Sequence, residues 1–167
     1  MSNNVCQEQV FQSIFITQAE GLRNFMYYKT GSLQQAEDLM QDAFGKLWEN
    51  CAKVVIDKAK SFLFTVANNL FLNQVAHQKV VLKFENQGHT QQTNVNPQFL
   101  LEEQEFKKRL EGAISALPEG QRVVFLMNRI DKKKYREIAV ELAISVKAVE
   151  KRMHQALSTL RKIHKKV

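Results

Sequence analysis

The sequence predicts an all-α protein made of two small helical domains joined by a flexible linker. Apolar residues recur at spacings of three and four over most of the chain, as they do on the buried face of an α-helix. Residues 83–98 interrupt this pattern with an almost wholly polar stretch. Because such a stretch has little reason to pack, we expect domains over residues 1–79 and 99–167, with a linker over 80–98.

Helical patterns account for most of the first domain. Residues 8–30 hold an interrupted pattern that Gly31 can terminate in a left-handed conformation. The apolar stripe over residues 36–48 is the most regular in the chain, and Ser32 opens a capping box before it. A further helical pattern extends over residues 59–79.

The second domain is predicted to contain four helices. The first covers residues 100–117, opens with Leu100 and Leu101, and ends where a proline follows. Residues 121–128 form the second. The last two lie within residues 135–160, where two short apolar patterns meet at a tight turn.

The paired helices over residues 135–160 predict a helix-turn-helix. Ala139 is small at the point where two steeply crossed helices approach most closely, and the first apolar pattern stops at Ala143. Ser145 can cap the second helix. The outward polar residues of that helix can reach base edges or phosphates, and they are Lys147, Glu150, Lys151, Arg152, His154 and Gln155.

The charge distribution favours DNA as the partner of this hairpin. The net charge is +7, and residues 99–167 carry sixteen Lys and Arg against nine Asp and Glu. Residues 1–79 carry seven of each kind. A basic excess confined to the segment with the hairpin is expected of a phosphate-facing surface. The alternative is a solvated αα-hairpin that touches no DNA.

Other protein classes find little support in the sequence. No apolar run reaches the length of a membrane span and no export signal is recognisable, so we expect a cytoplasmic protein without membrane insertion. Cys6 and Cys51 lie far apart without a CxxC pair, and the histidines are scattered. We therefore predict free thiols and no metal site. Without a phosphate loop or nucleophile elbow, we expect neither catalytic residues nor a cofactor, and thus no enzyme.

Two polar strips lie on the predicted helices of the first domain. One is mainly acidic and consists of Asp38, Gln41, Asp42 and Glu49. The other places Thr65, Asn69 and Asn73 at i, i+4 and i+8, beside Phe62, Phe64 and Phe71. Amides beside aromatic rings suit single-stranded bases. Spacing alone, however, favours phenylalanines in the core and an acidic strip that is merely solvated.

Three stretches in a fixed order resemble a known family. They are AEDLMQDAFGKLWEN (Ala36 to Asn50), FLFTVANNLFLNQVAHQK (Phe62 to Lys79) and the segment that holds the hairpin (Ala116 to Lys162). The chain resembles a bacterial RNA polymerase sigma factor of the small extracytoplasmic-function group of the sigma-70 family. The resemblance implies promoter-specific transcription initiation, with core RNA polymerase, promoter DNA and an anti-sigma factor as partners.

The resemblance also implies roles for particular residues. The acidic strip would bind the clamp coiled coil of the largest polymerase subunit. The helix over Phe62 to Lys79 would open and read the minus-10 element, with contacts from Thr65, Asn69, Asn73 and Lys79. The hairpin would read the minus-35 element. Ala143 occupies a turn position where glycine is common in the family, at a cost of about 1 kcal/mol if its φ is positive.

Two other classes of protein stay open from the residues alone. A stand-alone helix-turn-helix repressor or activator would need its own dimer contact and a palindromic site. A helical adaptor that binds only protein would show no salt-dependent affinity for DNA.

Overall fold

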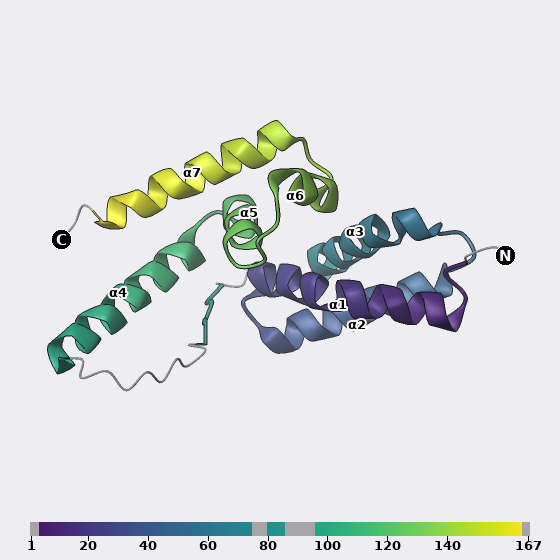
Figure 1. Cartoon of the computed structure of the whole chain (residues 1–167), viewed down its shortest axis with the longest axis horizontal. Helices are drawn as coiled ribbons and strands as arrows, with labels where there is room; N and C mark the ends of the chain where they lie inside the picture. Colours follow the sequence, from purple (N-terminus) through teal and green to yellow (C-terminus); the bar gives the residue numbers. More distant parts are fainter. Residues whose placement is uncertain (1–3, 75–79, 86–95, 165–167) are drawn as a thin grey trace.

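A computed structural model describes residues 4–74, 80–85 and 96–164, and over these ranges it contains seven α-helices and no strand. The helices are α1 (Glu8–Thr30), α2 (Leu33–Glu49), α3 (Ile56–Gln74), α4 (Pro97–Ala116), α5 (Glu119–Arg129), α6 (Tyr135–Leu142) and α7 (Val146–His164). Figure 1 shows α1–α3 as one group and α4–α7 as another, with α5 and α6 where the groups meet. We call these groups the N-terminal unit and the C-terminal unit. The predicted all-α class is confirmed.

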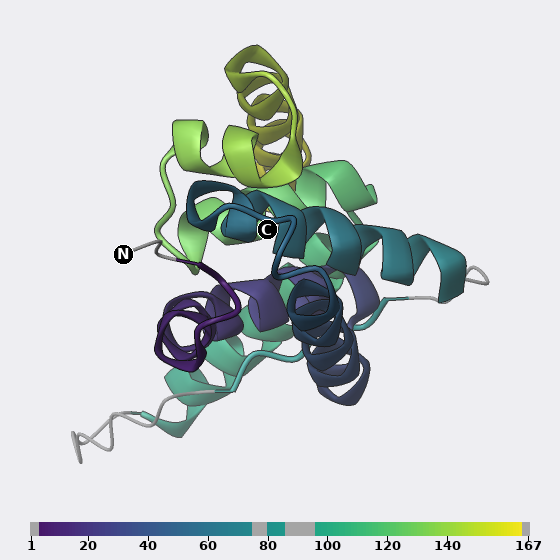
Figure 2. The same cartoon turned by 90° about the vertical axis from the view of Figure 1, so that its right-hand side faces the viewer.

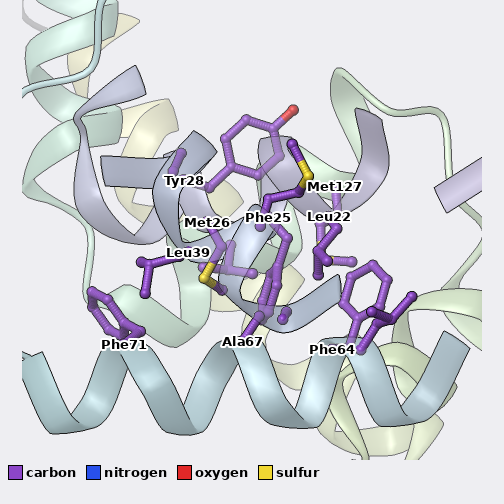
Figure 3. Close-up of a cluster of buried hydrophobic side chains, with 14 of the residues drawn as sticks. Leu22, Phe25, Met26, Tyr28, Leu39, Phe64, Ala67, Phe71 and Met127 are labelled. Atoms are coloured by element: carbon purple, nitrogen blue, oxygen red, sulfur yellow. The ribbon is translucent and has the colours of Figure 1, made fainter. Parts of the chain in front are cut away.

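The N-terminal unit has a core of apolar side chains from all three of its helices. Figure 3 shows Phe64, Ala67 and Phe71 projecting from α3 toward side chains of α1 such as Phe25. The rings of Phe25 and Phe64 lie 5.1 Å apart. Phe64 and Phe71 are buried and Phe62 is half-buried. The interpretation of Phe64 and Phe71 as core residues is therefore confirmed, and neither ring is exposed for stacking on a base.

Local signals at the turn between α1 and α2 behave as the sequence predicts. Gly31 ends α1 with φ 69°, and its N–H donates to the Tyr27 carbonyl at 2.8 Å. The Ser32 hydroxyl accepts from the Gln35 N–H at 3.3 Å and so caps α2. A side chain at Gly31 would also collide with the chain that passes over it, because its Cβ would lie 2.9 Å from Val80 Cγ1.

Part of the expected linker packs against the helices. Leu82 is buried, and its N–H donates to the Ser115 hydroxyl at 3.1 Å. The Tyr27 hydroxyl donates to the Lys83 carbonyl at 2.7 Å. Val80 and Phe84 also pack against the core, so residues 80–85 of the expected linker lie against the helices. Residues 86–95 lie outside the described residues.

The two ends of α4 differ in burial. Leu100 and Leu101, which open its pattern in the sequence, are exposed, whereas Ile114 and Leu117 at the other end are buried. Figure 1 shows the N-terminal half of α4 extending beyond the rest of its unit. An apolar pattern predicts which face of a helix could be buried, but only the neighbouring elements decide whether it is.

The two cysteines form a disulfide, so the prediction of free thiols is wrong. Cys6 precedes α1 and Cys51 follows α2, and their Cα atoms lie 5.0 Å apart. The turn at Gly31 makes α1 and α2 antiparallel neighbours, which brings the start of one beside the end of the other. Sequence spacing could not reveal this contact, because it arises from how the two helices pack.

We predict that removing the disulfide destabilises the N-terminal unit. The link closes a loop of 45 residues, for which chain entropy gives about 4 kcal/mol of stabilisation as an upper figure. The double variant Cys6→Ser with Cys51→Ser should therefore unfold at a lower urea concentration than the oxidised protein. A reductant should lower the midpoint of the unaltered protein and leave that of the variant unchanged. Equal midpoints for variant and oxidised protein would contradict the stabilising role.

Candidate nucleic-acid interface

Helices α6 and α7 meet in the tight turn that the sequence predicts. Ala143 has φ 53°, in the left-handed region. Its N–H donates to the Val140 carbonyl at 3.3 Å, and the Ile144 N–H donates to the Ala139 carbonyl at 3.0 Å. This pair of bonds is a Schellman motif, which satisfies carbonyls at the end of α6. The Ser145 hydroxyl then accepts from the Ala148 N–H at 3.1 Å and caps α7.

The buried face of the hairpin determines which face of α7 is presented to solvent. Ile138 and Ala139 of α6 are buried, as are Val149, Met153 and Ala156 of α7. These side chains pack α7 against α5 and α6. On the opposite side of α7 the predicted readers Lys147, Glu150, Lys151, His154 and Gln155 are all exposed.

Arg152 does not lie with the other five predicted DNA readers. It is half-buried, and its guanidinium carbon would lie 3.3 Å from a Cβ at Gly120, so it rests on α5 where that residue has no side chain. The Gln155 side chain also touches α5, because its Oε1 accepts from Gln121 Nε2 at 3.4 Å.

The polar strip of α3 is exposed along one side of that helix. Thr65, Asn69 and Asn73 are all solvent-exposed. Their neighbour Asn68 instead turns toward α1, where its side-chain oxygen accepts from Lys29 Nζ. Lys79, which was grouped with this strip, lies outside the described residues.

The acidic strip of α2 is also exposed, and an apolar groove lies beside it. Asp38, Gln41, Asp42 and Glu49 are all solvent-exposed, and Glu49 pairs with Lys46 at 3.2 Å. The groove has a volume of about 590 Å³ and is lined by Glu8, Phe11, Phe15, Gln41, Phe44, Gly45 and Trp48. Trp48 continues the inward stripe in the sequence, yet it is 49% exposed at the edge of this groove.

Several charged groups that sequence reasoning did not single out are buried near the contact between the units. Among the described residues the buried charged side chains are Lys29, Arg122 and Glu141. Asp131 is partly buried and accepts from the Tyr28 hydroxyl at 2.7 Å. Burial raises the pKa of Asp131 and lowers the pKa of Arg122. The pKa of Tyr28 is also raised. Burial is the larger cause, and the nearby Asp131 carboxylate is the second.

Neither a membrane helix nor a metal cluster is found within the part of the chain that the structure describes. None of its helices is both long and apolar enough to cross a bilayer. No group of three or more His, Cys, Asp or Glu side chains comes close enough together there to hold a metal ion.

Both halves of the chain match models of one protein family. Residues 16–80 match the model of sigma-70 region 2, and residues 107–160 match the model of sigma-70 region 4. The first match contains α2, α3 and much of α1, and the second contains α5, α6 and most of α7.

Curated relatives cover most of the chain at modest identity. The RNA polymerase sigma factor YlaC of Bacillus subtilis is 27% identical over 144 residues, which are 83% of this chain and 83% of that protein. The ECF RNA polymerase sigma factor SigW of Bacillus subtilis is 25% identical over 166 residues, or 93% of this chain and 89% of SigW.

Solved structures with the same fold also cover both units. The sigma factor RpoE, crystallised with the anti-sigma factor NepR from Bartonella quintana, superposes with a TM-score of 0.64 at 19% identity, over 93% of this chain and 96% of that chain. CnrH in complex with the cytosolic domain of CnrY gives a TM-score of 0.62 at 18% identity, over 93% and 87% of the two chains.

The helical fold and the exposed basic face of α7 define a helix-turn-helix protein with a second helical unit. The match to sigma-70 region 2 in the first unit, followed by the match to region 4 in the second, identifies the family within this class. The chain belongs to the sigma-70 family of bacterial RNA polymerase sigma factors, in the extracytoplasmic-function group. It directs core RNA polymerase to promoters and initiates transcription there.

We predict that Ala143→Gly stabilises the protein by roughly 0.5–1 kcal/mol, because glycine relieves the left-handed strain but adds chain entropy to the unfolded state. Urea denaturation measures the change. The matched control is Ala148→Gly within α7, which should instead lose about 1 kcal/mol because its backbone is helical. Equal losses at both positions would mean that the turn at Ala143 is unstrained.

Proposed function

We propose that the two units divide promoter recognition between them, and that α2 binds the polymerase. In this proposal α3 reads the minus-10 element and α7 reads the minus-35 element. The observation that carries it is the exposure of three separate polar strips on α2, α3 and α7, each on a helix whose opposite face is buried. These strips are the faces of the three helices that are free to contact a polymerase or DNA.

The acidic strip of α2 suits a basic protein surface. Asp38, Asp42 and Glu49 lie on one exposed side of a helix that the core fixes firmly in place. Charges arranged on a rigid element steer a complementary partner and fix its register. The partner we propose is the clamp coiled coil of the largest subunit of core RNA polymerase.

The strip of α3 suits bases that have left the duplex stack. Thr65, Asn69 and Asn73 offer hydroxyl and amide groups without charge, which can pair with the edge of an extruded base. Since Phe64 and Phe71 are buried, this surface would read bases mainly through hydrogen bonds. Lys79 stays part of the proposed contact surface, beyond the described residues.

The strip of α7 suits the major groove of duplex DNA. Base contacts come mainly from the N-terminal part of a recognition helix, where Lys147, Glu150 and Lys151 lie. Glu150 is the one acid on this face. A carboxylate facing phosphates would be repelled, so we assign it a hydrogen bond from a cytosine amino group. Arg152 and Gln155 touch α5, so we assign them smaller roles in contacting DNA.

Further properties follow from the same proposal. The protein acts in the cytoplasm, where its polymerase is, and has no catalytic activity of its own. An anti-sigma factor would hold it inactive until a signal arrives, since the sigma factor RpoE, which has the same fold, was crystallised with the anti-sigma factor NepR.

Reconstitution tests the proposed function. The purified protein is added to bacterial core RNA polymerase with genomic DNA fragments, and transcripts that start at defined positions are sought. Specific initiation that depends on the protein is the expected result. Absence of initiation with several core polymerases, together with salt-dependent binding to a palindromic site, would favour a stand-alone regulator instead.

We predict that Asp38→Lys with Asp42→Lys weakens binding to core polymerase at least tenfold, or about 1.4 kcal/mol, because reversed charges repel a basic partner. A fluorescence titration with core polymerase measures this affinity. The matched control is Glu20→Lys with Glu85→Lys, which makes the same change of charge at exposed positions off the strip. Equal affinities of the two double variants would show that the acidic strip is merely solvated.

We predict that Glu150→Ala changes the preferred upstream sequence, by about 1–3 kcal/mol at one base pair. Lys147→Ala serves as comparison, because loss of a phosphate contact should weaken all sequences alike and reduce the salt slope by about one. Selection from a randomised minus-35 element reads out both variants. Uniformly tighter binding by Glu150→Ala would identify Glu150 as a misplaced charge that reads no base.

A further inference from the structure

The disulfide lies at one end of the N-terminal unit, beside the apolar groove between α1 and α2. Figures 1 and 2 show the start of α1 and the connection from α2 to α3 at this same end, near the N-terminus. Cys6 lies two residues before α1 begins, and Cys51 lies two residues after α2 ends. The link therefore joins the two helices at the end where Glu8 and Trp48 line the groove.

Short contacts connect the disulfide to the edge of the groove. The Cys51 N–H donates to the Trp48 carbonyl at 3.2 Å, and the Trp48 ring meets the Phe11 ring edge-on, with the ring centroids 5.1 Å apart. The Phe11 N–H donates to the carbonyl of Gln7, the neighbour of Cys6, at 2.9 Å. A change at the two sulfur atoms is therefore transmitted to both aromatic rings through a few bonds in each helix.

The groove is continuous with the acidic strip that we assign to polymerase binding. Gln41 belongs to both, and Glu49 of the strip directly follows Trp48. Phe15 and Trp48, which line the groove, are partly exposed. An apolar groove bordered by carboxylates suits a partner that combines apolar side chains with positive charge. The position of this end of α2 thus affects the surface that is offered to the polymerase.

The disulfide lies in a protein whose proposed place of action is the cytoplasm. Thiol reductants of the cytoplasm break most disulfides, and those that form there are commonly transient and redox-sensing. Cys6 and Cys51 are each partly exposed. A small thiol can therefore approach the bond, which exchange requires because the attacking thiolate must reach a sulfur atom.

We propose that Cys6 and Cys51 form a reversible redox site that controls the binding of core polymerase by α2. The proposal rests on the proposed function. The oxidised form binds more tightly, because the link holds the start of α1 and the end of α2 together before the partner arrives. In the reduced form the same ends must be ordered on binding, which costs part of the affinity.

The reactants of this site are a low-molecular-weight thiol, such as glutathione, and its disulfide. In reduction a thiolate attacks one sulfur of the pair, the S–S bond breaks, and the other sulfur leaves as a thiolate that takes up a proton. A second thiol then attacks the mixed disulfide and releases the second cysteine. Two thiols are thereby oxidised to one disulfide while the protein gains two electrons and two protons, and oxidation of the protein is the reverse.

Apolar anchors keep both helix ends near their places when the bond is open. Val5, the neighbour of Cys6, is fully buried, and so is Leu47 in the last turn of α2. Burial of these side chains does not require the disulfide, since it arises from packing on the core of the unit. Reduction therefore loosens the two ends and leaves the core in place, so both forms of the site are folded.

A redox titration of the full chain tests whether the site is reversible. The protein is equilibrated with glutathione and glutathione disulfide at different ratios, and free thiols are trapped with a maleimide and counted by mass. We expect the bond to open in the excess of glutathione found in cytoplasm and to close as glutathione disulfide is added. The emission of Trp48, the one tryptophan of the chain, should shift to longer wavelength on opening because the ring becomes more hydrated. A bond that stays closed in excess glutathione, fails to close again, or opens without a change at Trp48 refutes the proposal.

Affinity for core polymerase supplies the functional readout. We expect the oxidised protein to bind roughly fivefold more tightly than the reduced protein in a fluorescence titration, since ordering one or two side chains on binding has an effect of this size. The matched control is Cys6→Ser with Cys51→Ser, measured with and without the same reductant, and its affinity should not change. By linkage, bound polymerase should make the bond harder to reduce by the same factor, or about 20 mV for a two-electron couple.

The outcomes separate the redox site from the proposed function. Equal binding by the oxidised and reduced forms, or tighter binding by the reduced form, refutes the proposed control, and initiation by either form leaves the function standing. If neither form binds polymerase or initiates transcription, the proposed function is wrong and the control of polymerase binding is refuted with it. The main comparison uses two states of one unaltered chain, and urea denaturation of the reduced state checks that it is folded.

Discussion

The buried guanidinium of Arg122 holds together the helices on which the rest of the structure depends. Its Nε donates to the Tyr28 carbonyl at 2.8 Å, and its Nη1 donates to the carbonyls of Leu117 at 2.9 Å and Ser115 at 3.3 Å. These carbonyls lie at the C-terminal ends of α1 and α4, where intrahelical donors are lacking. A fixed positive charge also interacts favourably with both helix ends. One side chain of α5 therefore orients two other helices.

The placement of α5 determines which face of α7 is exposed to solvent. Helix α7 packs along α5 through Val149 and Met153, and α6 lies between α5 and α3. The exposed face of α7 is thus determined by contacts that begin at Arg122 and end at the caps of the hairpin. Apolar burial supplies most of the free energy of such packing, while hydrogen-bonded charges fix which arrangement is adopted.

The sequence predicts those parts of the structure that depend on local physics. The left-handed Gly31, the caps at Ser32 and Ser145, and the turn at Ala143 all involve contacts within a few residues. The regular stripe of α2 predicts a helix with one buried face for the same reason, since its period is a property of the helix alone. The polar strips of α2, α3 and α7 are exposed because each lies opposite an apolar stripe that is buried.

The parts that sequence reasoning missed depend on contacts between distant segments. Cys6 meets Cys51 only because α1 and α2 pack as neighbours. Glu141 stands three residues after the buried Ile138, on the inner side of α6, which is a signal for a paired carboxylate. Its partner Lys60 could not be found in this way, because nothing local to α3 marks that lysine among the others.

The disulfide lies within one unit, whereas the charged contacts of Asp131 and Glu141 join the two units. Both ends of the disulfide lie within the N-terminal unit, so the link strengthens that unit and leaves its separation from the other unit unrestricted. The charged contacts of Asp131 and Glu141 cross between the units, and water can replace their partners on the N-terminal side. The buried apolar side chains of the two units form one continuous cluster, so separating the units would expose apolar surface as well as these charges. The disulfide therefore stabilises the packing of α1 on α2, whereas apolar burial and the paired charges together determine how α5 and α6 lie on α1 and α3.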